Sequence, residues 1–146
     1  MRFQYLAIIG LCASIGIQAA EPADPLSRHK FNDWEDDIGY RGAVVSNNQL
    51  HLAGIPCGGK DMADAVTVCY GIIQETLKKF GVTTDSIIKE TIYTTDIEAL
   101  KKAQDVRKKF FSPGRYPAAT WVQINKLYDP GLLIEFDLLV QLPKVQ

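Results

Sequence analysis

The final apolar segment carries the two side chains best suited to proton chemistry. From Leu132 to Leu142, residues alternate so that one set is wholly apolar and the other includes Glu135 and Asp137. Successive side chains of a β-strand point to opposite faces, so both carboxylates share a face with leucines. Desolvation on such a face would raise the pKa of Glu135, which suits a carboxyl group to general acid–base catalysis. The alternative for Glu135 is a solvated or ion-paired strand carboxylate, and we interpret Asp137, on the same face, as a rim group or an intersubunit salt-bridge group.

The cysteines and histidines form no pattern typical of a metal site or an activated nucleophile. Cys57 follows a predicted strand, Cys69 lies inside a predicted helix, and no histidine pair is near either of them. An oxidising compartment would permit a disulfide, but the reach between these two elements is doubtful, and we favour two buried thiols. His29 and His51 have no partner pattern. We expect neither a metal nor another cofactor.

Length, composition and charge are those of one ordinary globular domain. The 146 residues are 47% hydrophobic and 23% charged, and the formal net charge is −1. A single domain typically has about this length. A near-neutral surface offers no basic stripe for a phosphate backbone, so we do not expect nucleic acid as a partner.

The first 20 residues have the layout of a secretory signal peptide. Arg2 supplies a positive charge, residues 6–17 are almost wholly apolar, and the segment ends in the small residues Ala19 and Ala20. The apolar run is too short for a membrane span, which needs about 20 residues. We therefore expect cleavage after Ala19 or Ala20 and export, to the periplasm if the source is a bacterium. The alternative is an uncleaved N-terminal anchor.

The mature chain is expected to begin with a flexible polar leader, residues 21–33, and to continue as one domain, residues 34–144. Hydrophobic periodicity predicts the elements of this domain. They are a hairpin with strands 44–45 and 50–53 around Asn47 and Asn48, a break at residues 55–59, a helix from Met62 to Phe80 that Gly81 ends, a strand at 87–94, a helix at 97–111, and strands at 118–124 and 132–142.

The resulting order, β-β-α-β-α-β-β, predicts an α+β sandwich. Strands separated by helices require right-handed crossovers, and two helices then cover one face of the sheet. The last strand has a mixed second face, on which leucines alternate with carboxylates. This mixture indicates burial against something other than the domain's own helices, such as a partner subunit.

Several short motifs, in this order, resemble the Rid (reactive intermediate deaminase) family over residues 34–142. The most diagnostic is the closing segment from Tyr116 to Glu135. The motifs are Trp34-Glu35, Gly39-Tyr40, Leu52-Ala53-Gly54, Phe80-Gly81, Thr91-Ile92-Tyr93-Thr94-Thr95-Asp96, and Tyr116-Pro117-Ala118-Ala119-Thr120 followed by Leu127, Pro130-Gly131 and Ile134-Glu135.

The resemblance implies a chorismate-mutase-like (ferredoxin-like) fold and a homotrimer with small-molecule clefts between subunits. The better-known members hydrolyse enamines and imines to ketones and ammonia. In those enzymes an arginine two residues after the signature proline clamps the substrate carboxylate, whereas this sequence has Ala119. A methyl group cannot replace a bidentate guanidinium. The usual 2-imino-acid substrate therefore loses its main anchor here.

The family's motifs assign roles to individual residues of this sequence. Glu135 matches the glutamate that positions or activates water, and Tyr40 matches a cleft tyrosine; these are the candidate catalytic residues. The candidate substrate-binding residues are Gly54, Ala119, Thr120, Trp121 and Gln104. Each has a structural alternative, such as packing for an aromatic or a turn for a glycine. Arg41 and Arg115 are candidates to replace the missing anion anchor from other backbone positions, although surface arginines are the commoner explanation.

Two functions follow from these residues. We favour an enzyme, a Rid-type hydrolase in which Glu135 activates water for attack on a small C=N electrophile. The alternative is a non-catalytic trimer that binds a small metabolite or a protein client, because Ala119 removes the anchor while the cleft remains. We reject ribonuclease activity, a label attached to the family, because the sequence offers no histidine pair and no basic groove.

Overall fold

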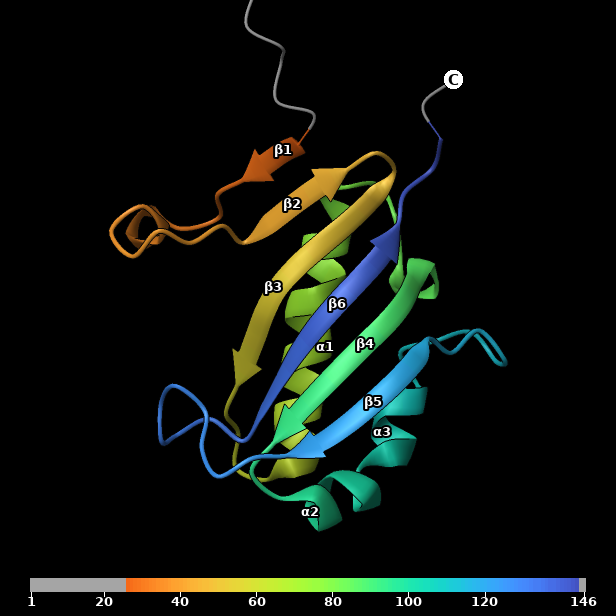
Figure 1. The fold of residues 1–146 in the computed structure, drawn as a ribbon. Helices are drawn as coiled ribbons and strands as arrows, with labels where there is room; N and C mark the ends of the chain where they lie inside the picture. Colours follow the sequence, from red (N-terminus) through yellow and green to blue (C-terminus); the bar gives the residue numbers. More distant parts are fainter. Residues whose placement is uncertain (1–25, 145–146) are drawn as a thin grey trace, which may run out of the picture.

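The computed structural model describes residues 26–144, which form an α+β domain with its helices on one side of a single sheet (Figure 1). The sheet has six strands in the order β1-β2-β3-β6-β4-β5, in which only β4 and β5 are parallel neighbours. The strands are β1 (Leu26–His29), β2 (Ala43–Ser46), β3 (Gln49–Cys57), β4 (Ile87–Thr94), β5 (Ala118–Gln123) and β6 (Ile134–Gln141), and the helices are α1 (Met62–Lys78), α2 (Ile97–Lys102) and α3 (Gln104–Lys108). The expected α+β class is confirmed.

The helix face of the sheet forms the core. Along β6, Ile134, Phe136, Leu138 and Val140 are buried, and α1 packs against them with its own apolar side. α1 begins after Asp61, whose side chain accepts from the backbone N–H of Asp64, as an N-cap does. The predicted alternation of the last strand is therefore confirmed, and it leaves the opposite face of the sheet free of helices. Among residues 26–144, no helix is long and apolar enough to cross a membrane.

Two local predictions about element limits are wrong. β3 does not break at Ile55 but continues to Cys57, because residues 55–57 pair with β6 after an irregularity in the register. The expected single helix of residues 97–111 is interrupted at Ala103, whose φ of −87° and ψ of 1° separate α2 from α3. The predicted hairpin turn is correct, since Asn47 adopts a positive φ of 55°.

The segment expected to be a flexible polar leader contributes a strand. Residues 26–29 pair with β2 in antiparallel register, from Leu26 opposite Ser46 to His29 opposite Ala43. Their polar side chains gave no strand pattern, because an edge strand is held chiefly by backbone hydrogen bonds. A short 3₁₀ turn, Asp33–Glu35, follows β1. The predicted signal peptide, residues 1–20, lies outside the described residues.

Cys57 and Cys69 are joined by a disulfide, which contradicts the expectation of two buried thiols. Their Cα atoms lie 5.7 Å apart, within the range that a disulfide requires. The prediction failed because β3 extends to Cys57 and passes directly over α1, where Cys69 is fully buried. The bond therefore ties the end of β3 to the second turn of α1.

Candidate functional site

Tyr40, Gly54 and Glu135 meet on the face of the sheet that carries no helices. The hydroxyl of Tyr40 donates to the backbone carbonyl of Gly54 at 3.4 Å. A Cβ atom built on Gly54 would lie 1.8 Å from Oε1 of Glu135. Only a glycine leaves room for the carboxylate at this place. Three residues from separate parts of the sequence thus form one small polar group.

Tyr40 is held by a loop that is anchored on the buried carboxylate of Glu35. This carboxylate accepts hydrogen bonds from the backbone N–H groups of Phe31, Asn32 and Gly42, each at 2.9 Å. Desolvation raises its pKa, but these hydrogen bonds lower it more, so the net pKa lies below the ordinary value. Glu35 therefore stays ionised and fixes both ends of the loop between residues 31 and 42.

Burial and a neighbouring negative charge make the carboxyl group of Glu135 a weaker acid than that of an ordinary glutamate. Desolvation raises the pKa of its carboxyl group, and the carboxylate of Asp137 on the same face raises it further. The pKa of Tyr40 is also raised, first by desolvation and then by the charges of Glu135 and Glu35. A carboxyl group with a raised pKa, next to a neutral hydroxyl, can exchange a proton with a bound water or nitrogen atom.

Asp137 is exposed, and its negative charge raises the pKa of Glu135. Within residues 26–144 the side chains of Asp137 and Glu135 form no ion pair or hydrogen bond. Across the sheet, Asp137 stands opposite Thr91 of β4, and Glu135 stands opposite Tyr93. Tyr93 is therefore a neighbour of the group that the sequence motifs did not point to as a site residue.

The other predicted site residues lie elsewhere in the same chain. β4 separates β5 from β6, and the register places Ala119 and Trp121 beside Glu90 and Ile92, on the helix face. Thr120 points to the open face, where its Oγ1 accepts from the ammonium of Lys89. Gln104 is exposed on α3. One chain therefore holds two separate groups of candidate residues.

A buried polar cluster beneath β5 was not predicted. Glu90 is fully buried, accepts from the Nε of Arg107 at 2.7 Å, and accepts from the hydroxyl of Tyr70 at 2.9 Å. Burial raises the pKa of Glu90 more than the guanidinium lowers it, and burial with the Glu90 charge raises the pKa of Tyr70. The indole Nε1 of Trp121 is buried without a well-aligned partner, although it lies close enough to lower the Glu90 pKa.

The sequence does contain a signal for this cluster. Along β4 the buried positions are Ile87, Glu90, Ile92 and Thr94, so Glu90 is a charged residue at a core position of a strand. A fully buried carboxylate needs a partner of opposite charge. The partner could not be identified from the sequence, because Arg107 comes from a helix 17 residues further along.

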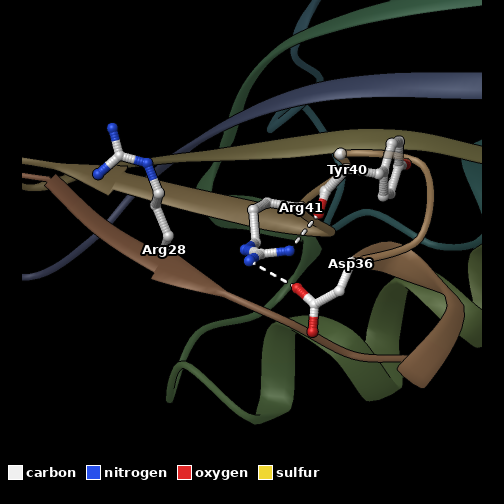
Figure 2. Close-up of a pocket in the computed structure, with 5 residues that line it drawn as sticks. Arg28, Asp36, Tyr40 and Arg41 are labelled. Atoms are coloured by element: carbon white, nitrogen blue, oxygen red, sulfur yellow. Dashed lines mark hydrogen bonds and ion pairs between the residues drawn. The ribbon is translucent and has the colours of Figure 1, made fainter.

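The two candidate replacements for the missing arginine are already engaged on the surface. Arg41 pairs with Asp36 at 2.7 Å and donates to the backbone carbonyl of Tyr40 at 2.6 Å (Figure 2). It lines a shallow hollow of about 260 Å³. Arg115 lies 3.5 Å from Asp85 beside another hollow, of about 380 Å³. In the described part of the chain, no group of three or more His, Cys, Asp or Glu side chains is placed to hold a metal ion.

Comparison with known proteins identifies the fold and the family. The family model described as Endoribonuclease L-PSP matches residues 35–142. A member of the YjgF/YER057c/UK114 family from Mycobacterium tuberculosis is similar, with 24% identity and a TM-score of 0.71 over 80% of this chain and 99% of that one. A YjgF family protein from Neisseria meningitidis has 19% identity and a TM-score of 0.72 over 82% and 97%. A protein of unknown function from Pseudomonas aeruginosa has 23% identity and a TM-score of 0.72 over 80% and 92%. No curated protein matches the sequence.

Proposed function

The chain belongs to the YjgF/Rid family, and from this premise we propose that it is a hydrolase of small, reactive enamines or imines. One observation carries the proposal. The raised-pKa carboxyl group of Glu135, the hydroxyl of Tyr40 and the bare backbone of Gly54 lie together on an open face. All three were expected from the family's motifs, and the fold brings them within contact distance across two strands and a loop.

The chemistry requires a base that becomes an acid within one turnover. The Glu135 carboxylate takes a proton from water as the water oxygen adds to the imine carbon. The resulting carboxylic acid gives this proton to the nitrogen, which yields a carbinolamine. The regenerated carboxylate then takes the hydroxyl proton of the carbinolamine and passes it to the amino nitrogen as the C=O bond forms and the C–N bond breaks, and a ketone and ammonia leave. An enamine enters the same route after its carbon gains a proton and its nitrogen loses one, which gives the imine. A carboxyl group with a raised pKa performs both transfers more readily than an ordinary one. Tyr40 is placed to hold the water or the nitrogen.

The complete site requires a second copy of the chain. Glu135 and Tyr40 lie on the open face, whereas Ala119, Trp121 and Gln104 lie towards the helices and the β5 edge. We propose a homotrimer in which the open face of one subunit meets the β5 edge of its neighbour. Leu139 of the open face is half-buried in the single chain, and a subunit contact would complete its burial. Sedimentation or light scattering of the purified protein tests this assembly, and a stable monomer would contradict it.

Hydrolysis is tested by ammonia release from freshly generated imines. Glu135→Gln keeps the shape of the side chain but cannot accept the proton, so the rate falls by about 10²- to 10⁴-fold if Glu135 is the acid–base group. Tyr40→Phe lowers the rate by a smaller factor. Glu98→Gln is the matched control, because Glu98 is exposed on α2 and pairs only with Lys101. Equal rates of ammonia release for wild type and Glu135→Gln, or no turnover of any imine, would contradict the proposal.

A non-catalytic small-molecule-binding trimer is the second candidate. The observation in its favour is that the family's arginine is Ala119, and that the neighbouring Arg107 is neutralised by Glu90 beneath Trp121. Such a protein would bind ligands without turning them over. Titration of the tryptophan fluorescence with small carboxylates, aldehydes and aromatic amines tests it. Saturable quenching without ammonia release supports this candidate, and the absence of quenching argues against it.

We also propose that the protein is exported through its N-terminal segment. The buried disulfide supports this, because disulfides persist in oxidising compartments and are rare in the cytosol. Cell fractionation with mass spectrometry of the mature N-terminus tests it. An intact Met1 on cytosolic protein would contradict export.

A further inference from the structure

The charges that face the Glu135 site are negative. Glu135 and Asp137 are alternate residues of β6, so their side chains project from the same face, about 7 Å apart at the backbone. Neither carboxylate meets a cation within residues 26–144. Lys89 is the nearest lysine in the register, one same-face position from Thr91, yet its ammonium donates to Thr120 of β5 and not to Asp137.

Aromatic rings border the same site. Trp34 lies with its ring centroid 5.4 Å from that of Tyr40, and it is 49% exposed. Tyr93 stands opposite Glu135 on β4, half-buried and on the open face. Exposed aromatic faces beside carboxylates are the combination that attracts organic cations, because the ring quadrupole and the carboxylate charge act in the same direction.

Two arginines of the described chain are engaged away from this site. Arg41 pairs with Asp36 and with the Tyr40 carbonyl. Arg107 is 7% exposed and pairs with Glu90 on the other face of the sheet. The residue at the position of the family's arginine is Ala119. A ligand carboxylate placed next to Glu135 and Asp137 would therefore meet repulsion that neither of these arginines offsets.

From these contacts we infer that the Glu135 site selects a positively charged ligand, an iminium or an imine that carries an amine, in place of a carboxylate-bearing imine. The inference rests on the site of the proposed hydrolase and names the charge of its substrate. Asp137 is the specificity-determining residue, because it supplies negative charge to the site without contacting Tyr40 or Gly54. Trp34 and Tyr93 supply the aromatic surfaces.

The test compares imines of one carbon skeleton that carry a distal ammonium, a neutral amide or a carboxylate. In ammonia-release assays, kcat/KM follows the order ammonium, amide, carboxylate, with about 5- to 50-fold between the first two. Asp137→Asn removes most of this difference, and Asp137→Lys reverses it. Asp105→Asn is the control with the same change of charge, since Asp105 lies on α3 and pairs with Lys108. A preference for the carboxylate, or an unchanged preference in Asp137→Asn, would overturn the inference while leaving the hydrolase in place.

A binding experiment separates failure of the charge inference from failure of the proposed function. Tryptophan fluorescence is titrated with choline and with its neutral tert-butyl isostere, at low and at high salt. The inference predicts that choline binds more tightly than the neutral isostere, and that this difference in affinity shrinks in Asp137→Asn and with added salt. This result would support the inference even if the protein turns over no imine. Equal affinity for the two probes, or no saturable signal from either, refutes it.

Discussion

Substitution of Gly54 by alanine gives the sharpest test of the Glu135 site. The added Cβ would lie 1.8 Å from Oε1, 2.8 Å from Cδ and 3.2 Å from Cγ of Glu135. An ordinary contact is 3.4 Å or longer, so the carboxylate must retreat by about 1.6 Å. A misplacement of about 1 Å in a catalytic group costs about 100-fold in rate. We expect kcat/KM for imine hydrolysis to fall by about that factor.

The same substitution should hardly change stability. Gly54 does not have a positive φ, so its backbone accepts alanine. The carboxylate can move to another rotamer at a cost of about 0.5–1.5 kcal/mol. Alanine also gives the unfolded chain less conformational entropy than glycine does, which stabilises the folded protein by about 0.4–1 kcal/mol. The free energy of unfolding, measured with denaturant, is therefore expected to stay within about 1 kcal/mol of wild type.

The assay pairs ammonia release with urea denaturation, and Gly71→Ala is the matched control. Gly71 lies on α1 with nothing within 4 Å of its added Cβ, and alanine is favoured over glycine in a helix by about 0.5–1 kcal/mol. Gly71→Ala should therefore be more stable and fully active. A folded Gly54→Ala protein with wild-type kcat/KM would refute the placement of the Glu135 carboxylate at the reacting atoms. Equal loss of activity in both variants would refute it as well.

Three further predictions concern stability. Replacing Glu90 by glutamine, or Arg107 by methionine, leaves one buried charge without its partner and should lower the free energy of unfolding by about 3–5 kcal/mol, whereas the double replacement should cost less than the sum of the two in a double-mutant cycle. Glu135→Gln should be more stable than wild type at neutral pH. The folded protein holds the Glu135 proton more tightly than the unfolded chain does, so wild-type stability falls as the pH rises from the ordinary pKa of 4.5 through the folded pKa. Denaturation at several pH values should therefore show that the free energies of unfolding of the two proteins converge in acid. Reduction of the bond between Cys57 and Cys69, which are 12 positions apart, should lower the free energy of unfolding by about 3 kcal/mol. Peptide mapping without reductant checks the bond, and an unchanged urea midpoint after reduction would contradict this expectation.

Local periodicity in the sequence determined the main elements of the domain. The alternation along β6 fixed which face is apolar and which carries Glu135, because side-chain direction in a strand depends only on residue parity. The helical repeat from Met62 and the stop at Gly81, with φ of 70°, fixed α1 in the same way. The motifs also pointed to Tyr40, Gly54 and Glu135, which the fold brings together.

Only the tertiary structure decided the contacts between residues that are far apart in the chain or that lack a pattern. β1 exists because its backbone pairs with β2, and a polar edge strand leaves no periodic signal. The Glu90–Arg107 pair joins a strand to a helix. The disulfide depends on β3 reaching Cys57 above α1. The sequence fixes the direction of each side chain within its element, whereas distances between elements depend on how the sheet and helices pack, and no single segment contains that information.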